Sequence, residues 1–256
     1  MQVNIQYGSK FEHRYKGRFI FVVSHMRSFS SLLCHILGSH PQISGYAEAQ
    51  QSYLGRPDLD RLARIVGQLT GDPALRPYVL DKILHNERQI MSRVLDRPDV
   101  KVVFLLRNAE DTLTSMLNIA HALDPEGRYA DPERALEYYV TRLQQLQHYA
   151  SELGPRALFV ESERLVDDTE TVLDALSAWL LLDPRLSAEY QTFPFTGKYG
   201  YGDPSPNISR GTIVKDVGER HRDYVEIRIP DDVLERANAA YRACREALAR
   251  SAGVRA

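Results

Sequence analysis

The stretch that decides the fold is FIFVVSHMRSFSSLLCHILGSHPQI, residues 19–43. It begins with the apolar run FIFVV, typical of a buried strand, and ends with the apolar spacing of an amphipathic helix. Between them lies a short turn, SHMRSFSS, that is basic and rich in hydroxyl groups. A turn that leads from a buried strand into a helix directs free backbone N–H groups at an anion. The stretch therefore predicts an anion site whose side-chain donors are Arg27, Ser28, Ser30 and Ser31.

Segments of strand type and helix type alternate along the rest of the chain. Short runs that are apolar and rich in β-branched or aromatic residues predict buried strands at residues 19–23, 78–83, 102–106 and 157–160. Amphipathic patterns predict helices at residues 131–153, 169–182 and 231–252. This alternation indicates right-handed crossovers between parallel strands. We therefore expect an α/β fold in three layers, with a central parallel sheet and helices on both faces.

Composition narrows the class of protein. The chain has 256 residues, 43% of them hydrophobic, with 32 Lys and Arg against 34 Asp and Glu. No linker divides it, so we expect a single domain over residues 1–256. The balanced charge gives no support for nucleic-acid binding, and no run approaches the roughly 20 apolar residues of a membrane span. Any anion site must be local, and the oligomeric state stays open.

The cysteines and the start of the chain predict the compartment. Cys34 and Cys244 fall on the apolar faces of predicted helices, so we expect buried free thiols rather than a disulfide or metal site. The first residues carry no apolar core of the kind that a signal peptide needs. No Cys, His and Asp cluster has the spacing of a zinc or calcium site. We expect a cytoplasmic protein without a bound metal.

One long segment, residues 183–228, has neither helical nor strand periodicity. Segments of this kind in compact domains are lids, binding loops or disordered regions. Its aromatic residues either line an acceptor pocket or pack the segment onto the body of the protein. They are Tyr190, Phe193, Phe195, Tyr199 and Tyr201.

The familiar phosphate-binding loop of nucleotide triphosphatases, GxxxxGK[ST], is absent from the turn after the first strand. The later strand VVFLLRN ends in Arg107, where such an enzyme would place an aspartate for magnesium. An anion that carries its own reactive group and needs no metal suits these residues better. A P-loop small-molecule kinase, which uses ATP and magnesium, is the enzymatic alternative.

With these residues in place, the chain resembles the sulfotransferases that use 3′-phosphoadenosine 5′-phosphosulfate, a family with a P-loop-like α/β fold. SHMRSFSSLLCHILGSHPQISGYAE resembles their 5′-phosphosulfate loop, and KVVFLLRNAEDTLTSML their 3′-phosphate signature, with Arg107 and Ser115 at the matching positions. LDKILHNERQI resembles the segment that brings a lysine, here Lys82, near the sulfuryl group. SRGTIVKD resembles the C-terminal basic loop, with Arg210, Gly211 and Lys215. The resemblance spans residues 19–215.

The resemblance implies sulfuryl transfer from 3′-phosphoadenosine 5′-phosphosulfate to a hydroxyl of a small-molecule, carbohydrate or natural-product acceptor. Arg27 and Lys82 would place positive charge on the leaving oxygen. The residues implied to hold the 5′ end of the nucleotide are Arg27, Ser28, Phe29, Ser30, Ser31 and Leu32. Those implied to hold its 3′-phosphate are Arg107, Ser115, Arg210, Gly211 and Lys215.

Two residues compete for the role of general base. Glu48 follows the first helix where the tyrosylprotein branch of the family places a glutamate, and we favour it. His85 lies near the histidine position of the cytosolic branch, but the spacing here is K-x-x-H rather than K-x-H. His25 is a lesser candidate and is expected to be a hydrogen-bonded loop side chain.

Phe29 stands where the family usually has glycine, and Met26 where it has proline. A side chain at position 29 implies either an ordinary helical φ or a shifted loop. Because Phe29 replaces this glycine, a third hypothesis stands beside the sulfotransferase and the kinase. It is a nucleotide-binding or partner-binding protein of the same fold that does not catalyse transfer.

Overall fold

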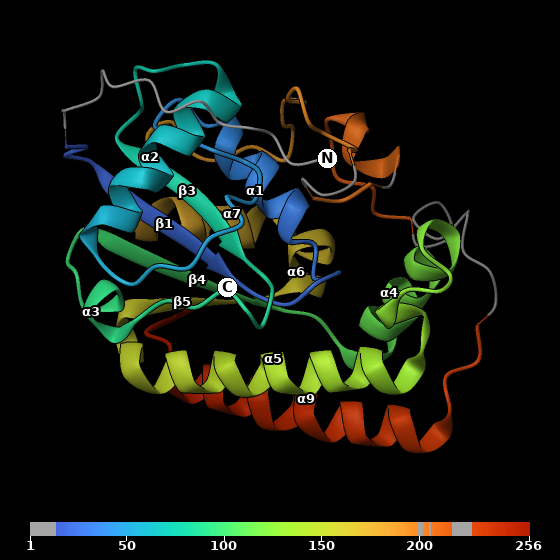
Figure 1. Cartoon of the computed structure of the whole chain (residues 1–256). Coiled ribbons are helices and arrows are strands. Elements are labelled where there is room, and N and C mark those ends of the chain that lie inside the picture. The colour runs from blue at the N-terminus through green and yellow to red at the C-terminus, as the bar shows by residue number, and fades with distance from the viewer. Residues whose placement is uncertain (1–13, 199–201, 205, 217–226) are drawn as a thin grey trace.

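The computed structural model describes residues 14–198, 202–204, 206–216 and 227–256. Within them the chain forms one six-stranded parallel sheet in the order β2-β3-β1-β4-β5-β6 (Figure 1). The strands are β1 Arg18–Val23, β2 Ile43–Ser44, β3 Tyr78–Ile83, β4 Val100–Leu106, β5 Ala157–Glu161 and β6 Val254–Arg255. The α/β class and the parallel sheet predicted from the sequence are confirmed.

The central strand β1 sorts its side chains onto two faces because successive residues of a strand point in opposite directions. Phe19, Phe21 and Val23 belong to one core cluster, which they share with residues of α2, α3, α5 and α9. Ile20 and Val22 belong to the other, with residues of α1, α6 and α7. Helices therefore cover both faces, which makes the three expected layers.

The helices are α1 Ser30–Ser39, α2 Arg56–Thr70, α3 Ser92–Leu95, α4 Ala109–Leu123, α5 Pro132–Leu153, α6 Ser162–Asp167, α7 Thr169–Leu180 and α9 Asp231–Ser251. Short 3-10 helices are η1 Arg128–Ala130, η2 Gly154–Arg156 and η3 Pro206–Arg210. In Figure 1, α5 and α9 run side by side along one face of the sheet. Helix α4 stands beyond the sheet, next to the end of α5.

The observed helices and strands match the predicted ones where a capping residue or another local sequence feature marks their ends. Asp131 caps α5 by accepting a hydrogen bond from the backbone N–H of Arg134 at 2.9 Å. Helix α7 ends at Leu180, two residues before the predicted end, because Leu181 adopts a left-handed conformation with φ 59°. The elements that were not predicted are short or lack a local signal, and they include α3, α6 and the 3-10 helices. The strands β2 and β6 have only two residues each, and α2 begins without a Ser, Thr, Asp or Asn cap.

The irregular segment docks on the body of the protein over its described part. Glu189 and Thr212 form an antiparallel bridge, and the backbone N–H of Tyr190 donates to the carbonyl of Gly211 at 2.8 Å. The 3-10 helix η3 belongs to the loop that these two contacts close. The segment therefore returns on itself and places η3 beside the carboxyl end of the sheet.

Candidate functional site

A cavity of about 400 Å³ opens at the carboxyl ends of β1, β3 and β4. The turn between β1 and α1 forms its floor, α4 one wall, and residues of the irregular segment another. Ligands of open parallel sheets bind at this edge. The residues that line the cavity include Met26, Arg27, Ser28, Phe29, Ser30, Ser31, Leu32, Glu48, Lys82, His85, Arg107, Met116, Leu123, Tyr129, Val166, Tyr190, Asp203, Asn207 and Val214.

Phe29 takes the backbone conformation that glycine would otherwise supply. Its φ of 61° is left-handed, as is the 63° of Arg27 two residues earlier. A left-handed conformation costs an ordinary residue about 1–2 kcal/mol. The guanidinium carbon of Arg107 lies 4.3 Å from the centroid of the Phe29 ring, a cation–π contact that offsets part of this cost. Of the two alternatives for Phe29, the ordinary helical φ is therefore excluded, and α1 begins at Ser30 directly after it.

Two side chains of the turn brace it from within. The hydroxyl of Ser28 donates to the carbonyl of His25 at 2.7 Å and lies 2.6 Å from the hydroxyl of Ser24. The His25 ring is fully buried, with Nδ1 2.9 Å from the carbonyl of Met26 and Nε2 accepting from the backbone N–H of Arg107 at 3.1 Å. Burial lowers the pKa of His25 to about 3, so the ring is neutral. It links the turn to the end of β4, in line with its expected role as a loop side chain.

Lys82, Glu48 and His85 form a contiguous group at the end of β3. Lys82 Nζ donates to the hydroxyl of Ser31 at 2.8 Å and lies 3.4 Å from Glu48 Oε1. The other carboxylate oxygen of Glu48 lies 3.3 Å from Nε2 of His85. The side chains of Lys82 and Glu48 are 1% and 8% exposed. Both candidates for the general base therefore touch each other beside a buried cation.

The ionisation of Glu48 follows from these neighbours. Burial by itself raises the pKa of Glu48, but Lys82 and His85 together outweigh it and hold the pKa below its ordinary value. Glu48 is consequently a carboxylate at neutral pH.

Asp81, which the sequence analysis did not single out, holds the loop that carries Glu48. Its Oδ1 accepts the backbone N–H of Ala49 at 2.8 Å, and its Oδ2 accepts the hydroxyl of Tyr53 at 2.5 Å. The side chain is fully buried, and burial raises the pKa of Asp81 to about 7. An acidic residue within the apolar run YVLDKI was the sequence signal that could have identified it.

The predicted 5′ and 3′ groups form one hydrogen-bonded unit. Arg27 Nε donates to the hydroxyl of Ser115 on α4 at 2.9 Å, and Arg107 Nη1 donates to the backbone carbonyl of Arg27 at 3.0 Å. Arg107 Nη2 also pairs with Asp111 at 3.1 Å. Asn108 caps α4 by accepting from the backbone N–H of Asp111, which fixes the helix that carries Ser115.

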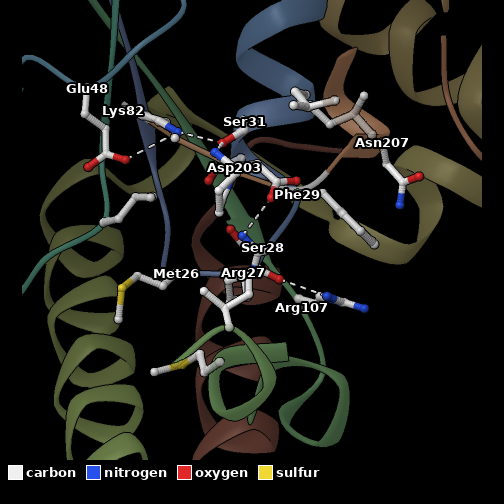
Figure 2. Close-up of a pocket in the computed structure, with 18 of the residues that line it drawn as sticks. Met26, Arg27, Ser28, Phe29, Ser31, Glu48, Lys82, Arg107, Asp203 and Asn207 are labelled. Carbon is white, nitrogen blue, oxygen red and sulfur yellow. Dashed lines mark hydrogen bonds and ion pairs between the residues drawn. The ribbon is translucent and has the colours of Figure 1, made fainter. Parts of the chain in front are cut away.

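An acidic residue of the irregular segment lies against these cations (Figure 2). Oδ1 of Asp203 is 3.1 Å from Nη1 of Arg27, and its backbone N–H donates to the hydroxyl of Ser31 at 2.9 Å. A Cβ atom on the preceding Gly202, whose φ is 148°, would lie 3.1 Å from Lys82 Nζ. The carboxylate of Asp203 therefore lies beside Arg27, one of the residues of the predicted anion site. Nothing in the local sequence pattern indicated this contact.

The predicted C-terminal basic loop lies apart from the cavity lining. Arg210 and Lys215 are exposed and are not among the residues that line the cavity. Gly211 has a left-handed φ of 72° and accepts the Tyr190 N–H described above. The neighbours Asn207, Ile208, Thr212 and Val214 line the cavity instead, and the sequence analysis missed them. The assignment of Arg210, Gly211 and Lys215 to a 3′-phosphate stays a prediction.

The aromatic residues of the irregular segment pack mainly on α1. Phe193 stacks on Tyr46 with centroids 4.2 Å apart, and both contact the ring of His35. The backbone N–H of Phe195 donates to the Tyr46 hydroxyl at 3.3 Å. Tyr190 also contacts His35 and lines the cavity. Phe193 and Tyr190 therefore pack on the body of the protein, and Tyr190 lines the cavity as well. Tyr199 and Tyr201 lie outside the described residues.

In the described part of the chain, none of the helices has both the length and the apolar character needed to span a membrane. The same residues contain no group of three or more His, Cys, Asp or Glu side chains arranged to hold a metal ion.

Comparison with known proteins identifies the fold. The sulfotransferase domain from the curacin biosynthetic pathway superposes with a TM-score of 0.58 and 20% identity, over 89% of this chain and 98% of that domain. The sulfotransferase domain from the Synechococcus PCC 7002 olefin synthase superposes with a TM-score of 0.57 and 19% identity, over 91% of this chain and 98% of that domain. No family model and no curated protein matches the sequence. The chain thus has the fold of sulfotransferase domains.

Proposed function

We propose that this protein is a sulfotransferase that moves a sulfuryl group from 3′-phosphoadenosine 5′-phosphosulfate to a hydroxyl of a small-molecule, carbohydrate or natural-product acceptor. The observation that carries the proposal is the contact of Lys82 with both Ser31 and Glu48 at one end of the cavity. Sulfuryl transfer requires a cation near the leaving oxygen and a base for the proton of the acceptor. Lys82 contacts both the anion-binding turn and the carboxylate of Glu48, so the two would lie next to each other.

The residues present suit the nucleotide. The Asp203 carboxylate, 3.1 Å from Arg27, is a stand-in for its 5′ anion. Arg27, Lys82 and the hydroxyls of Ser30 and Ser31 would hold that end, together with backbone N–H groups at the start of α1. Arg107 and Ser115 would hold the 3′-phosphate. The adenine ring of the nucleotide would lie among apolar side chains of the cavity, which include Phe29, Leu32, Val166 and Ile208.

When bound, the nucleotide supplies the activated sulfuryl group, and the side chains supply the rest of the chemistry. Glu48, a carboxylate with a lowered pKa, would accept the proton of the acceptor hydroxyl. Lys82 and Arg27 would stabilise the negative charge that develops on the leaving oxygen. His85, 3.3 Å from Glu48, would orient the carboxylate or take over as the base. We favour Glu48 because it also contacts Lys82.

Calorimetric titration with adenosine 3′,5′-bisphosphate, compared with ATP and magnesium, tests the proposal. We expect the bisphosphate to bind and ATP with magnesium to bind far more weakly. Mass spectrometry of an acceptor panel incubated with 3′-phosphoadenosine 5′-phosphosulfate should then detect a product that carries a sulfate. Preference for ATP and magnesium would indicate a kinase. Binding of the bisphosphate without transfer to any acceptor would indicate a non-catalytic protein.

Replacing the proposed base gives the first prediction. Glu48→Gln should lower kcat by about 10²- to 10⁴-fold, the effect of a lost acid–base group, while the Kd of the bisphosphate changes little. Activity of the purified variants, measured at saturating nucleotide, checks this. His85→Gln is the matched variant, because it alters the other side of the same contact. If His85→Gln alone abolishes turnover, the base assignment is wrong.

We also infer a cytoplasmic location. The thiols of Cys34 and Cys244 are buried and free, and burial raises the pKa of each to about 12. Such inert thiols suit a reducing compartment, which supports this proposal.

A further inference from the structure

We propose that the acceptor is an uncharged alcohol on a flexible aliphatic chain, and that this chain lies along the second half of α4. The inference rests on the proposed function and names its acceptor class. Its basis is the apolar half of the cavity, which adjoins Glu48 and His85. Figure 2 shows Met26, Glu48 and Lys82 on one side of Arg27, with Phe29, Arg107 and Asn207 on the other. Met26 and Glu48 mark the half that the nucleotide-binding residues leave to the acceptor, and Lys82 lies at the border between the two halves.

Helix α4 supplies one wall of this half. Met116, Ile119, Ala120 and Leu123 all line the cavity, and their spacing of three and four residues places them on one helical face. Earlier in the helix, Leu113 is buried in the core and Ser115 accepts from Arg27. Met116 belongs to the core cluster as well as to the cavity lining, and the wall beyond it consists of Ile119, Ala120 and Leu123. From Met116 to Leu123 this wall runs about 10 Å at 1.5 Å per residue.

Met26, Leu84 and Tyr129 form the facing wall, and one buried tyrosine holds all three. The backbone N–H of Met26 donates to the Tyr138 hydroxyl at 2.7 Å, and that hydroxyl donates to the carbonyl of Leu84 at 2.7 Å. The ring of Tyr129 meets the ring of Tyr138 edge-on at 5.5 Å. Leu84 directly precedes His85, so the apolar wall begins at the candidate base. If the hydroxyl of the acceptor lies at Glu48, the rest of the acceptor chain contacts these side chains.

The polar groups of this half stand at its two ends. Glu48, Gln50 and His85 lie at the reactive end, and Asp124 follows the last residue of α4. At the reactive end the Glu48 carboxylate pairs with Lys82, and at the far end the charged side chain is Asp124, which disfavours an acceptor that carries an anion there. The aliphatic side chains between them offer a sugar no hydrogen-bond partners. Methionine side chains adapt to flexible partners, and Leu123, 53% exposed, leaves the far end open for a longer chain.

A homologous series of primary alkanols from butanol to decanol tests the inference. With 3′-phosphoadenosine 5′-phosphosulfate at saturation, kcat/KM for sulfation should rise with each added methylene, by up to about fourfold for full burial, and then level off. A methyl hexoside, and an alkanol of the same length that ends in a carboxylate, should be poorer acceptors. A flat series, or a preference for the hexoside or the carboxylate, would overturn the inference.

Leu123→Asn examines the far end of the wall. We expect it to lower the ratio of kcat/KM between decanol and butanol several-fold. Leu181→Asn is the matched control, because Leu181 also lies at the end of a helix, is 74% exposed and does not line the cavity. It should leave the ratio at the wild-type value. An unchanged ratio in Leu123→Asn would contradict the placement of the chain along α4.

Bisphosphate binding, measured on the same preparations, separates two kinds of failure. If the bisphosphate does not bind, the proposed function falls and the acceptor class falls with it. If the bisphosphate binds and another class of acceptor is sulfated, only the acceptor class is wrong.

Discussion

At the scale of single residues, the most consequential contact is that of Asp203 with Arg27. The carboxylate and guanidinium are 3.1 Å apart with side chains 22% and 19% exposed, in the place where the sequence predicts an anion. An acidic side chain and a nucleotide anion would then compete for the same cation. The affinity for nucleotide should therefore include the free energy of displacing Asp203.

Asp203→Asn should raise the affinity for adenosine 3′,5′-bisphosphate by up to about fivefold. A partly exposed ion pair contributes up to about 1 kcal/mol, and its loss removes the competitor. Titration calorimetry of the purified variant gives the Kd. Glu189→Gln is the control, because it makes the same change in net charge at an exposed position of the same segment. Equal affinity in wild type and Asp203→Asn would show that Asp203 does not compete.

At the scale of elements, the end of β3 organises the group around Glu48. Asp81 and Lys82 are neighbours on a strand and point to opposite faces. Asp81 binds the backbone of Ala49 from one face, and Lys82 pairs with Glu48 from the other. One strand end therefore holds both sides of the loop that carries the proposed base.

The buried carboxyl of Asp81 should make stability depend on pH. Its pKa is raised from 3.8 to about 7, so the folded protein keeps a proton that the unfolded chain releases. The contribution to stability is full below pH about 4 and is lost as the pH rises through about 7. Asp81→Asn removes the ionisation but keeps a side chain of the same shape. Denaturant unfolding at several pH values should show wild type losing stability relative to the variant across this window.

Two readings of that experiment are distinct. A difference between wild type and Asp81→Asn that shrinks towards acid pH and grows towards neutral pH supports the raised pKa. Parallel pH profiles would mean that Asp81 titrates alike in the folded and unfolded states.

At the scale of the whole molecule, Arg142 joins α5 to the edge of the sheet that carries the site. The side chain is fully buried, and its Nε and Nη2 donate to the carbonyls of Ser24 and Ile83 at 2.7 and 2.5 Å. Ser24 directly follows β1, the strand that leads into the anion-binding turn, and Ile83 is the last residue of β3, the strand that carries Lys82. Its Nη1 donates to Gln145 at 2.8 Å. One guanidinium thus fixes the spacing of both strand ends.

Arg142→Met should lower the free energy of unfolding by about 1–3 kcal/mol, because the buried carbonyl of Ser24 loses its donor. The Ile83 carbonyl still accepts the backbone N–H of Ser24 at 3.1 Å. Urea unfolding followed by circular dichroism measures the loss. Arg134→Met, an exposed position on the same helix, controls for the change in helix propensity and should be close to wild type. A stability equal to that of Arg134→Met would show that water satisfies the Ser24 carbonyl.

The local sequence determined the elements that carry the site. The turn after β1, the cap at Asn108 and the strand that ends in Arg107 depend on neighbours in the chain, so their patterns identify them. The α/β class, four strands and the helices α1, α5, α7 and α9 follow from such patterns. The fold brings the turn, Glu48, Lys82, His85 and Arg107, which the sequence proposed as site residues, to one cavity. Ser115, proposed with them, accepts a hydrogen bond from Arg27.

The tertiary structure decided which of these residues touch and what else joins them. Arg27 reaches Ser115 across 88 positions and Asp203 across 176, and Tyr138 and Arg142 reach the strand ends from α5. Such contacts are set by how the helices and the irregular segment pack on the sheet, and no local pattern encodes that packing. The apolar wall of α4 has the same origin, because helical spacing marks an apolar face but not whether it meets the core or a cavity.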